Sequence, residues 1–159
     1  MQIARLKELI VYEPETGAIT WAVSRGRVKS GDPANSPNGY GYLRVCIDRK
    51  SFMAHRVAWA MHYGEWPSKF IDHINGNKSD NRICNLRLAT RSENAQNVKR
   101  PYRSNKTGFA GVHYVKALGK YQAQICVNGK TKFLGRFMCV QKAYEVYERA
   151  KKELHPFAV

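Results

Sequence analysis

The stretch DHINGNKSDNRICNLRLATRSENAQN, residues 72–97, decides the fold of the first part of this chain. Apolar residues 70–71 lead into it and predict a short strand that ends at its first two residues. The Asn-Gly-Asn at 75–77 is a strong turn signal. Residues 86–89 offer a second short strand, and Ser92 is suited to cap a following helix. The stretch therefore predicts strand, loop, strand and helix.

This order places three kinds of polar side chain close together. Asp72 and His73 lie at the end of the first strand, and Asn94 lies on the helix. A carboxylate, an imidazole and a carboxamide in one small cleft can hold a hard divalent cation and activate a water molecule.

A simpler interpretation of the same residues is local structure. Asn is common in turns because it accepts left-handed backbone and hydrogen-bonds its neighbours. A single His after a strand is more often packed than catalytic. The joint occurrence of Asp-His, Asn-Leu-Arg and Glu-Asn-Ala-Gln-Asn in this order favours a functional site.

The motif resembles the HNH nucleases of the phage and intron-encoded branch, in which His-Asn-Asn replaces His-Asn-His. The resemblance implies a ββα-metal (His-Me finger) fold around one divalent ion. It implies Asp72 and Asn94 as metal ligands, His73 as the general base, and Asn85 as the central Asn that braces the loop. Carboxylate and carboxamide ligands favour Mg²⁺ or Mn²⁺, and the choice between these two stays open.

Charge is the informative bulk property of the chain. The 159 residues carry a formal net charge of +15, which fits a polyanionic partner. From residue 101 onward there are 11 Lys and Arg against 3 Glu, so the excess is densest there. The same charge would also suit a ribosomal or membrane-surface protein. No apolar run approaches the ~18 residues of a membrane span, so no transmembrane helix is expected.

The cysteines and the N-terminus argue against two other classes. The four cysteines lie far apart without a Cys-x-x-Cys pair, which predicts neither a structural zinc site nor a disulfide framework. They are expected as buried or half-buried thiols in a reducing compartment. The N-terminus lacks a basic segment followed by an apolar core, so no secretory signal is expected.

The residues before the motif predict short strands and one clear helix. Residues 54–63 have helical composition and end at Gly64, a natural C-cap. This region also resembles the N-terminal part of the same phage nucleases. His55 and Arg56 allow two roles, contact with the scissile phosphate or attachment of the helix to the metal motif, and the second is favoured.

A second unit follows a basic linker at 101–106. Strands are predicted at 111–115, 121–127 and 131–134, with Asn128-Gly129 as a strong hairpin signal. A helix with apolar residues at helical spacing runs to Leu154. Three antiparallel strands and one packing helix are therefore expected.

This second unit resembles the APETALA2-type DNA-binding domain. The similarity lies in Gly111-Val112, residues 120–125, Leu134-Gly135-Arg136-Phe137 and residues 143–147. In that family the sheet lies in the major groove and its outward side chains touch bases and phosphates. The resemblance implies DNA contacts for His113, Lys116, Lys120, Gln122, Gln124, Lys130, Lys132 and Arg136.

Together these features predict an α+β protein of two modules. Residues 1–100 are expected to form the nuclease domain, 101–106 the linker and 107–159 the DNA-binding domain. The expected activity is metal-dependent hydrolysis of phosphodiester bonds in double-stranded DNA, nicking one strand, in the cytoplasm of a bacterial host. A non-catalytic DNA-binding, regulatory or packaging protein on a nuclease scaffold is the alternative. The sequence leaves open the target site, the choice between nicking and double-strand cleavage, and the choice between monomer and homodimer.

Overall fold

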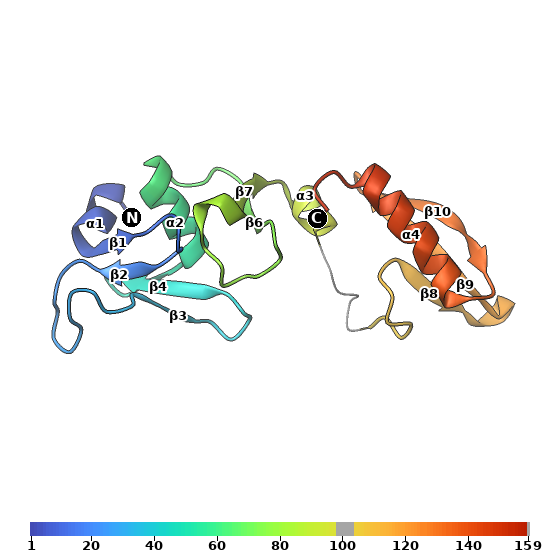
Figure 1. The fold of residues 1–159 in the computed structure, drawn as a ribbon, viewed down its shortest axis with the longest axis horizontal. Coiled ribbons are helices and arrows are strands. Elements are labelled where there is room, and N and C mark those ends of the chain that lie inside the picture. Colours follow the sequence, from blue (N-terminus) through green and yellow to red (C-terminus); the bar gives the residue numbers. More distant parts are fainter. Residues whose placement is uncertain (98–103, 159) are drawn as a thin grey trace. The chain divides into compact units, whose positions relative to one another are not determined.

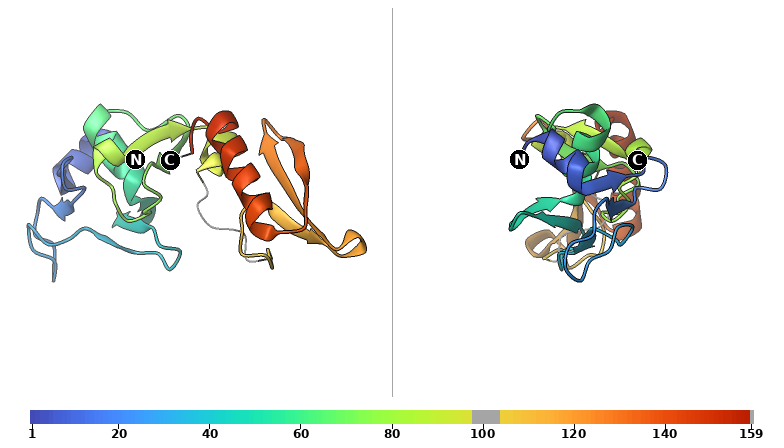
Figure 2. Two further views of the ribbon diagram at one scale, coloured as in Figure 1. Left: turned by 45° about the vertical axis from the view of Figure 1, so that its right-hand side comes forward. Right: turned by 90° about the vertical axis from the view of Figure 1, so that its left-hand side faces the viewer.

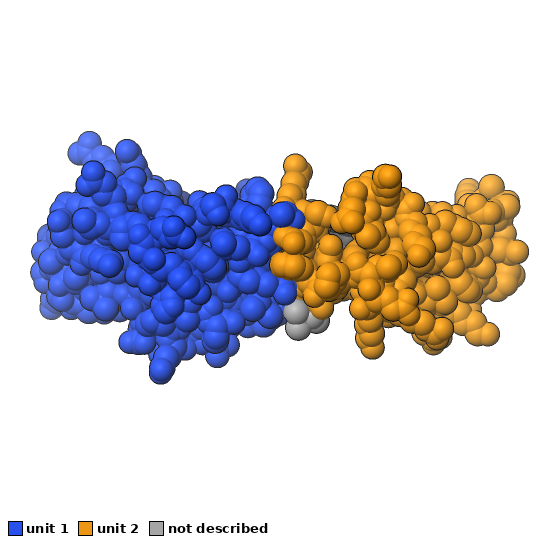
Figure 3. Space-filling view, turned by 90° about the horizontal axis from the view of Figure 1, so that it is seen from above, with its two compact units in different colours: residues 1–90 blue, residues 91–159 orange. Residues whose placement is uncertain are grey.

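The structure, a computed structural model, describes residues 1–97 and 104–158. The chain divides into two compact units, Met1–Thr90 and Arg91–Val159, which Figure 3 shows in different colours. Residues 101–103 of the expected linker lie outside the described residues, and the predicted domain boundaries stay a prediction. Within the described ranges, no helix has both the length and the apolar character needed to cross a membrane.

Unit 1 consists of short helices and small antiparallel sheets. Its strands form a β1–β2 pair, a three-stranded sheet of order β3-β4-β5 and a β6–β7 pair. The elements, shown in Figure 1, are α1 (Ile3–Leu9), β1 (Ile10–Tyr12), β2 (Ile19–Trp21), β3 (Asn35–Pro37), β4 (Leu43–Ile47), β5 (Lys50–Met53), α2 (Ala54–Tyr63), β6 (Phe70–His73), the 3-10 helix η1 (Ile83–Asn85) and β7 (Leu86–Ala89).

Local sequence explains where several of these elements end. Helix α2 ends at Gly64, which adopts the left-handed conformation with φ of 76°, as the sequence predicted. The tight β4–β5 hairpin turns at Asp48 and Arg49, whose φ angles of 48° and 62° suit a two-residue turn.

The core of unit 1 connects α2 to the strands that carry the motif. The main cluster includes the fully buried Leu6, Val45 and Val57. A second cluster joins Ala58 of α2 to Ile71 of β6 and Leu86 of β7. Because these three side chains pack together, α2 supports the β6–β7 pair from one side.

Unit 2 is a three-stranded antiparallel sheet with one long helix against it. The sheet has the order β10-β9-β8, and α4 covers one of its faces (Figure 2). The core includes Val112, Ala123, Ile125 and Tyr147. The elements are α3 (Arg91–Gln96), β8 (Val112–Val115), the 3-10 helix η2 (Lys116–Leu118), β9 (Lys120–Val127), β10 (Lys130–Phe137) and α4 (Val140–Leu154).

These elements confirm the predicted α+β class with several small antiparallel sheets. The segments β6, β7 and α3 follow one another as the ββα-metal fold requires. Helix α3 belongs to unit 2, however, so its packing against β6 and β7 stays a prediction. It begins at Arg91, one residue before the expected cap at Ser92.

One expectation about the cysteines is wrong. Cys46, Cys84, Cys126 and Cys139 are all exposed rather than buried or half-buried. Cys46 and Cys126 lie in strands at positions that alternate with buried neighbours, so their side chains point away from the two cores.

Candidate active site

The register of the β6–β7 pair places the acidic residue of the motif opposite a basic one. Asp72 is paired with Arg87 across the two strands. Its Oδ2 atom accepts hydrogen bonds from Arg87 Nε at 2.9 Å and from Arg87 Nη2 at 2.8 Å. Asp72 is only 5% exposed. This short ion pair fixes the orientation of a buried carboxylate.

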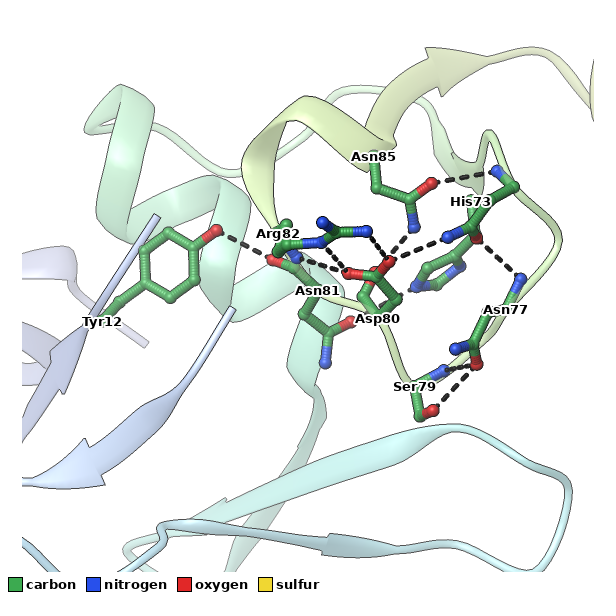
Figure 4. A network of polar contacts seen from close by, with 9 residues as sticks. Tyr12, His73, Asn77, Ser79, Asp80, Asn81, Arg82 and Asn85 are labelled. Atoms are coloured by element: carbon green, nitrogen blue, oxygen red, sulfur yellow. Dashed lines mark hydrogen bonds and ion pairs between the residues drawn. The ribbon is translucent and has the colours of Figure 1, made fainter. Parts of the chain in front are cut away.

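His73, the next residue, is equally well buried and is held by an amide. Its Nε2 atom lies 3.2 Å from Asn81 Oδ1 (Figure 4). Burial lowers the pKa of His73, although the hydrogen bond to Asn81 and the charge of Asp72 act in the opposite direction. The lowered pKa favours a neutral imidazole at neutral pH, the form that can accept a proton.

A second histidine and a tyrosine pack against this imidazole. The His55 ring on α2 makes an edge contact with His73, with centroids 5.1 Å apart. The Tyr42 ring lies 5.5 Å from His55 and 6.0 Å from His73. Burial and the charge of His73 lower the pKa of His55 to about 4. His55 thus attaches α2 to the motif, which agrees with the interpretation favoured from sequence.

Arg56, the neighbour of His55, binds backbone carbonyl groups of the segment that follows α2. It donates hydrogen bonds to the carbonyl oxygens of Pro67 at 3.1 Å and of Lys69 at 3.2 Å. These contacts hold the segment between α2 and β6.

Asn85 braces the loop between β6 and β7. Its Oδ1 atom accepts a hydrogen bond from the backbone N–H of Asn75 at 2.9 Å. Its Nδ2 atom donates to the carbonyl of Asp80 at 2.8 Å. Asn85 therefore connects both sides of the loop, and Figure 4 shows its side chain above Asp80.

Asp80 adds a local ion pair to the same loop. Its carboxylate accepts hydrogen bonds from the Arg82 guanidinium, with Nη2 2.6 Å from Oδ2, and from Asn75 Nδ2 at 2.8 Å. The Arg82 hydrogen bond is the main reason that the pKa of Asp80 is lowered to about 2. The loop is therefore organised by polar contacts within its own sequence.

The N-terminal turn of unit 1 supports the loop from outside. The Tyr12 hydroxyl donates to the carbonyl of Asn81 at 2.8 Å, and Ile83 N donates to the carbonyl of Pro14 at 3.0 Å. A Cβ atom on Gly17 would lie 2.6 Å from Arg82 N. Glycine is therefore required at position 17 by a backbone-to-backbone approach.

Sequence reasoning did not assign roles to several residues that form this site. Asn81 and Arg87 lie within the quoted motif, and their pairing follows only from the folded loop and the strand register. Tyr12 and Tyr42 come from distant segments, and the motif itself contains no signal for them.

The predicted metal ligands have the right chemistry for a hard cation. Asp72 offers carboxylate oxygen and Asn94 offers amide oxygen, both preferred by Mg²⁺ and Mn²⁺. Asn94 is exposed on α3 in unit 2, so its proximity to Asp72 stays a prediction. Over the described ranges, no three His, Cys, Asp or Glu side chains cluster as a metal site. The proposed pair differs from such a cluster because one of its ligands is a carboxamide.

The strand register sorts the predicted DNA contacts of unit 2 onto two faces of the sheet. Residues paired across an antiparallel sheet share a face, and alternate residues of a strand share a face. Val112, Ala123 and Ile125 face α4. The opposite, outer face therefore carries His113, Lys120, Gln122, Gln124 and Arg136.

Side chains on this outer face are connected to one another. Arg136 Nε donates to Gln122 Oε1 at 3.0 Å, and Gln122 Nε2 donates to Gln124 Oε1 at 3.3 Å. The guanidinium carbon of Arg136 lies 5.4 Å from the centre of the exposed Phe133 ring. The outer face is thus a polar surface with one cation and one aromatic ring in contact.

Two of the predicted residues lie on the other side of the sheet. Lys130 and Lys132 pair with Val127 and Ile125, which face α4, so both lie on the helix side of the sheet. The reason is a β-bulge between Phe133 and Gly135, which reverses the alternation of β10 relative to Arg136. Both lysine side chains are exposed there, and their contact with DNA stays a prediction. Lys116 lies in η2 and is exposed.

Comparison with known proteins supports the assignment of unit 1. The model of a family described as "HNH endonuclease" matches residues 52–96. The chain is 34% identical over 103 residues to Protein 3.8 of Escherichia phage T7, covering 64% of this chain and 83% of the relative. It is 30% identical over 112 residues to an uncharacterised HNH endonuclease of Acanthamoeba polyphaga mimivirus, covering 69% of this chain and 57% of that protein. No solved structure matches the chain.

The matched region contains α2, the Asp72-His73 pair and the braced loop, so the similarity covers the site described above. This finding confirms the expected enzyme class, a hydrolase that cleaves DNA. The chain belongs to the HNH endonuclease family.

Proposed function

We propose that the enzyme nicks double-stranded DNA with His73 as its general base. The observation that carries this proposal is the adjacent pair at the end of β6. Asp72 is fixed by Arg87 and His73 by Asn81, and both lie within the family match. A fixed carboxylate beside a neutral imidazole is a suitable arrangement for hydrolysis of a phosphodiester.

We assign the nitrogen that accepts the proton from the contact with Asn81. Because Asn81 Oδ1 lies next to His73 Nε2 and an amide oxygen can only accept, we place the hydrogen on Nε2 and the basic lone pair on Nδ1. Nδ1 takes a proton from water, the oxygen of that water forms a bond to phosphorus, and the bond from phosphorus to the leaving oxygen breaks. The lowered pKa of His73 keeps its imidazole neutral at neutral pH, the form that can accept this proton.

We assign Asp72 and Asn94 as the ligands of one divalent cation, Mg²⁺ or Mn²⁺, in a ββα-metal arrangement of β6, β7 and α3. When bound, the cation supplies charge stabilisation for the phosphate oxygens. Arg87 holds the Asp72 carboxylate in place for this role. Structural zinc is not part of the proposal, because the cysteines are dispersed in the sequence.

The second module, an APETALA2-like domain over residues 107–159, is proposed to bind duplex DNA with the outer face of its sheet. Arg136, Gln122 and Gln124 form a connected set of donors and acceptors on that face. Arg and Gln side chains are suited to the base edges of the major groove. The density of positive charge beyond residue 100 supports affinity for the phosphate backbone.

Nicking follows from one motif per chain, since a single site cuts one strand in each event. The relative from Escherichia phage T7 supports a bacterial cytoplasm as the site of action.

The test is single-turnover cleavage of a plasmid, with and without EDTA. The variant His73→Ala is expected to lose ~10²–10⁴-fold in rate while retaining DNA affinity. The matched control is His62→Ala, which removes an exposed histidine of α2 and is expected to cleave normally. Cleavage by the wild type in EDTA, or wild-type cleavage by a folded His73→Ala variant, would contradict the proposal.

A further inference from the structure

The loop between β3 and β4 is a rigid hairpin that exposes an aromatic ring. Asn38 Oδ1 accepts hydrogen bonds from Tyr40 N at 2.9 Å and from Tyr42 N at 3.2 Å. Asn38 N donates to the carbonyl of Tyr42 at 3.0 Å. Gly39 and Gly41 both adopt left-handed backbone, with φ of 82° and 84°. These contacts hold the loop in one shape, and the Tyr40 side chain at its tip is 81% exposed.

This hairpin is attached to the loop that follows the catalytic pair. Lys78 Nζ donates to the carbonyl of Tyr40 at 3.4 Å and lies 4.6 Å from the centre of the Tyr42 ring. The Tyr42 ring in turn contacts His73. Figure 4 shows the β3–β4 hairpin passing beside the loop that carries Asn77 and Ser79. Tyr40 is therefore connected to the candidate active site through Lys78 and Tyr42.

The chemistry of this corner fits a nucleoside and its phosphate. Because the backbone that carries Tyr40 is already held in one shape, only the side chain loses conformational freedom when its ring packs on a flat apolar surface. Tyrosine rings stack on bases of any sequence and pack against sugars. The Lys78 ammonium supplies positive charge at the same place, which favours a phosphate next to that nucleoside. Tyr40 is also the most exposed of the large hydrophobic side chains in the described residues.

We propose that Tyr40 binds the DNA substrate by packing its ring against a nucleoside next to the scissile phosphate. This contact positions the strand beside His73, and Lys78 adds charge for the neighbouring phosphate. The inference rests on the proposed function of His73, because that residue defines where the strand is cut. It adds a substrate-contacting residue from outside the matched motif region, which begins at residue 52.

The test is single-turnover cleavage at increasing concentrations of a nicking substrate, with the full chain and Mg²⁺ or Mn²⁺. Tyr40→Ala is expected to raise the concentration for half-maximal rate by roughly 10- to 100-fold. Tyr40→Phe is expected to retain wild-type behaviour, since the ring is what packs. The control is Tyr63→Ala, which removes another exposed tyrosine of unit 1, 52% exposed on α2, and is expected to be neutral. The thermal unfolding temperature of Tyr40→Ala should equal that of the wild type.

Substrates with one abasic position near the cut distinguish the base from the sugar. If Tyr40 stacks on a base, removing that base weakens the wild type to the level of Tyr40→Ala and leaves the variant unchanged. If the ring packs on a sugar, no abasic position has this effect. The proposal is overturned if Tyr40→Ala reaches half-maximal rate at the same substrate concentration as the wild type. It is also overturned if Tyr63→Ala raises that concentration as much as Tyr40→Ala does. Failure of the proposed function is distinguishable, because it appears as full activity in His73→Ala whatever Tyr40 does.

Discussion

Replacement of Asn85 by Ala tests the bracing of the catalytic loop. The side chain is 5% exposed and makes two hydrogen bonds, with Asn75 N at 2.9 Å and with the carbonyl of Asp80 at 2.8 Å. Alanine leaves both backbone groups without this partner. An unsatisfied buried polar group costs about 1–3 kcal/mol, and the loop is partly buried, so we expect a loss of about 2–4 kcal/mol in the free energy of unfolding.

Two measurements separate stability from positioning in this variant. Urea unfolding followed by tryptophan fluorescence gives the change in free energy. Single-turnover cleavage at a temperature where Asn85→Ala is folded gives the effect on chemistry. We expect a rate lower by about 10- to 100-fold, because the loop that begins after His73 is no longer held and small displacements of catalytic groups are costly.

The matched control is Asn77→Ala in the same loop. Asn77 is exposed. Its Oδ1 atom accepts hydrogen bonds from Ser79 N at 3.2 Å and from Ser79 Oγ at 2.8 Å, both shown in Figure 4. We expect a loss below about 1 kcal/mol for this exposed site. If Asn85→Ala unfolds and cleaves like Asn77→Ala, the assignment of Asn85 as the brace is refuted.

Three further predictions concern other parts of the chain. Gly17→Ala should lower the unfolding temperature more than Gly26→Ala, because both positions have positive φ but only the Cβ at 17 meets backbone, 2.6 Å from Arg82 N; equal shifts would contradict the close approach. The pKa of Asp80 is lowered to about 2 in the folded state. Its ion pair with Arg82 therefore stabilises the folded protein at any pH above the pKa of the unfolded carboxyl, and this stabilisation is lost as the pH falls from about 4 to about 2. The difference in unfolding free energy between wild type and Asp80→Asn should therefore be largest near neutral pH and shrink over that window, and a difference that is constant with pH would exclude this origin. Arg136→Ala should weaken binding to duplex DNA in a filter or anisotropy assay. If Arg136 contacts phosphate, the slope of log affinity against log salt concentration should fall by about 1; if it contacts a base edge, that slope should stay the same and the base preference should change. Unaltered affinity and base preference would remove Arg136 from the interface.

The sequence predicted elements that depend on local signals. Gly64 ends α2 because glycine accepts the left-handed conformation, and Asn128-Gly129 forms the β9–β10 turn with φ of 50° and 77°. The strands around Asp72 and Leu86 were also predicted, because short apolar segments flank a turn-rich loop. Such signals act over a few residues and are visible in the chain itself.

Features that depend on distant contacts were not predicted. The approach of Gly17 to Arg82 and the Tyr12 hydrogen bond to Asn81 join segments more than sixty residues apart. The opposite facing of Lys132 and Arg136 depends on one bulge beside Gly135, whose φ is 137°. A glycine inside a strand is compatible with a bulge, but the resulting change of face is visible only once the strands are paired. The placement of His73 at the end of β6 followed from the motif, whereas the packing of Tyr42 against its ring required the folded hairpin.

The bulge in β10 also affects whether unit 2 of one molecule can pair with unit 2 of another at high protein concentration. Strand β10 is an edge of its sheet, so one side of its backbone is open to pairing with a strand from another molecule. The irregularity between Phe133 and Gly135 interrupts the regular spacing that such pairing needs, and the cations at Lys130, Lys132 and Arg136 repel an identical edge. Molecules at high local concentration are therefore protected from joining edge to edge into aggregates.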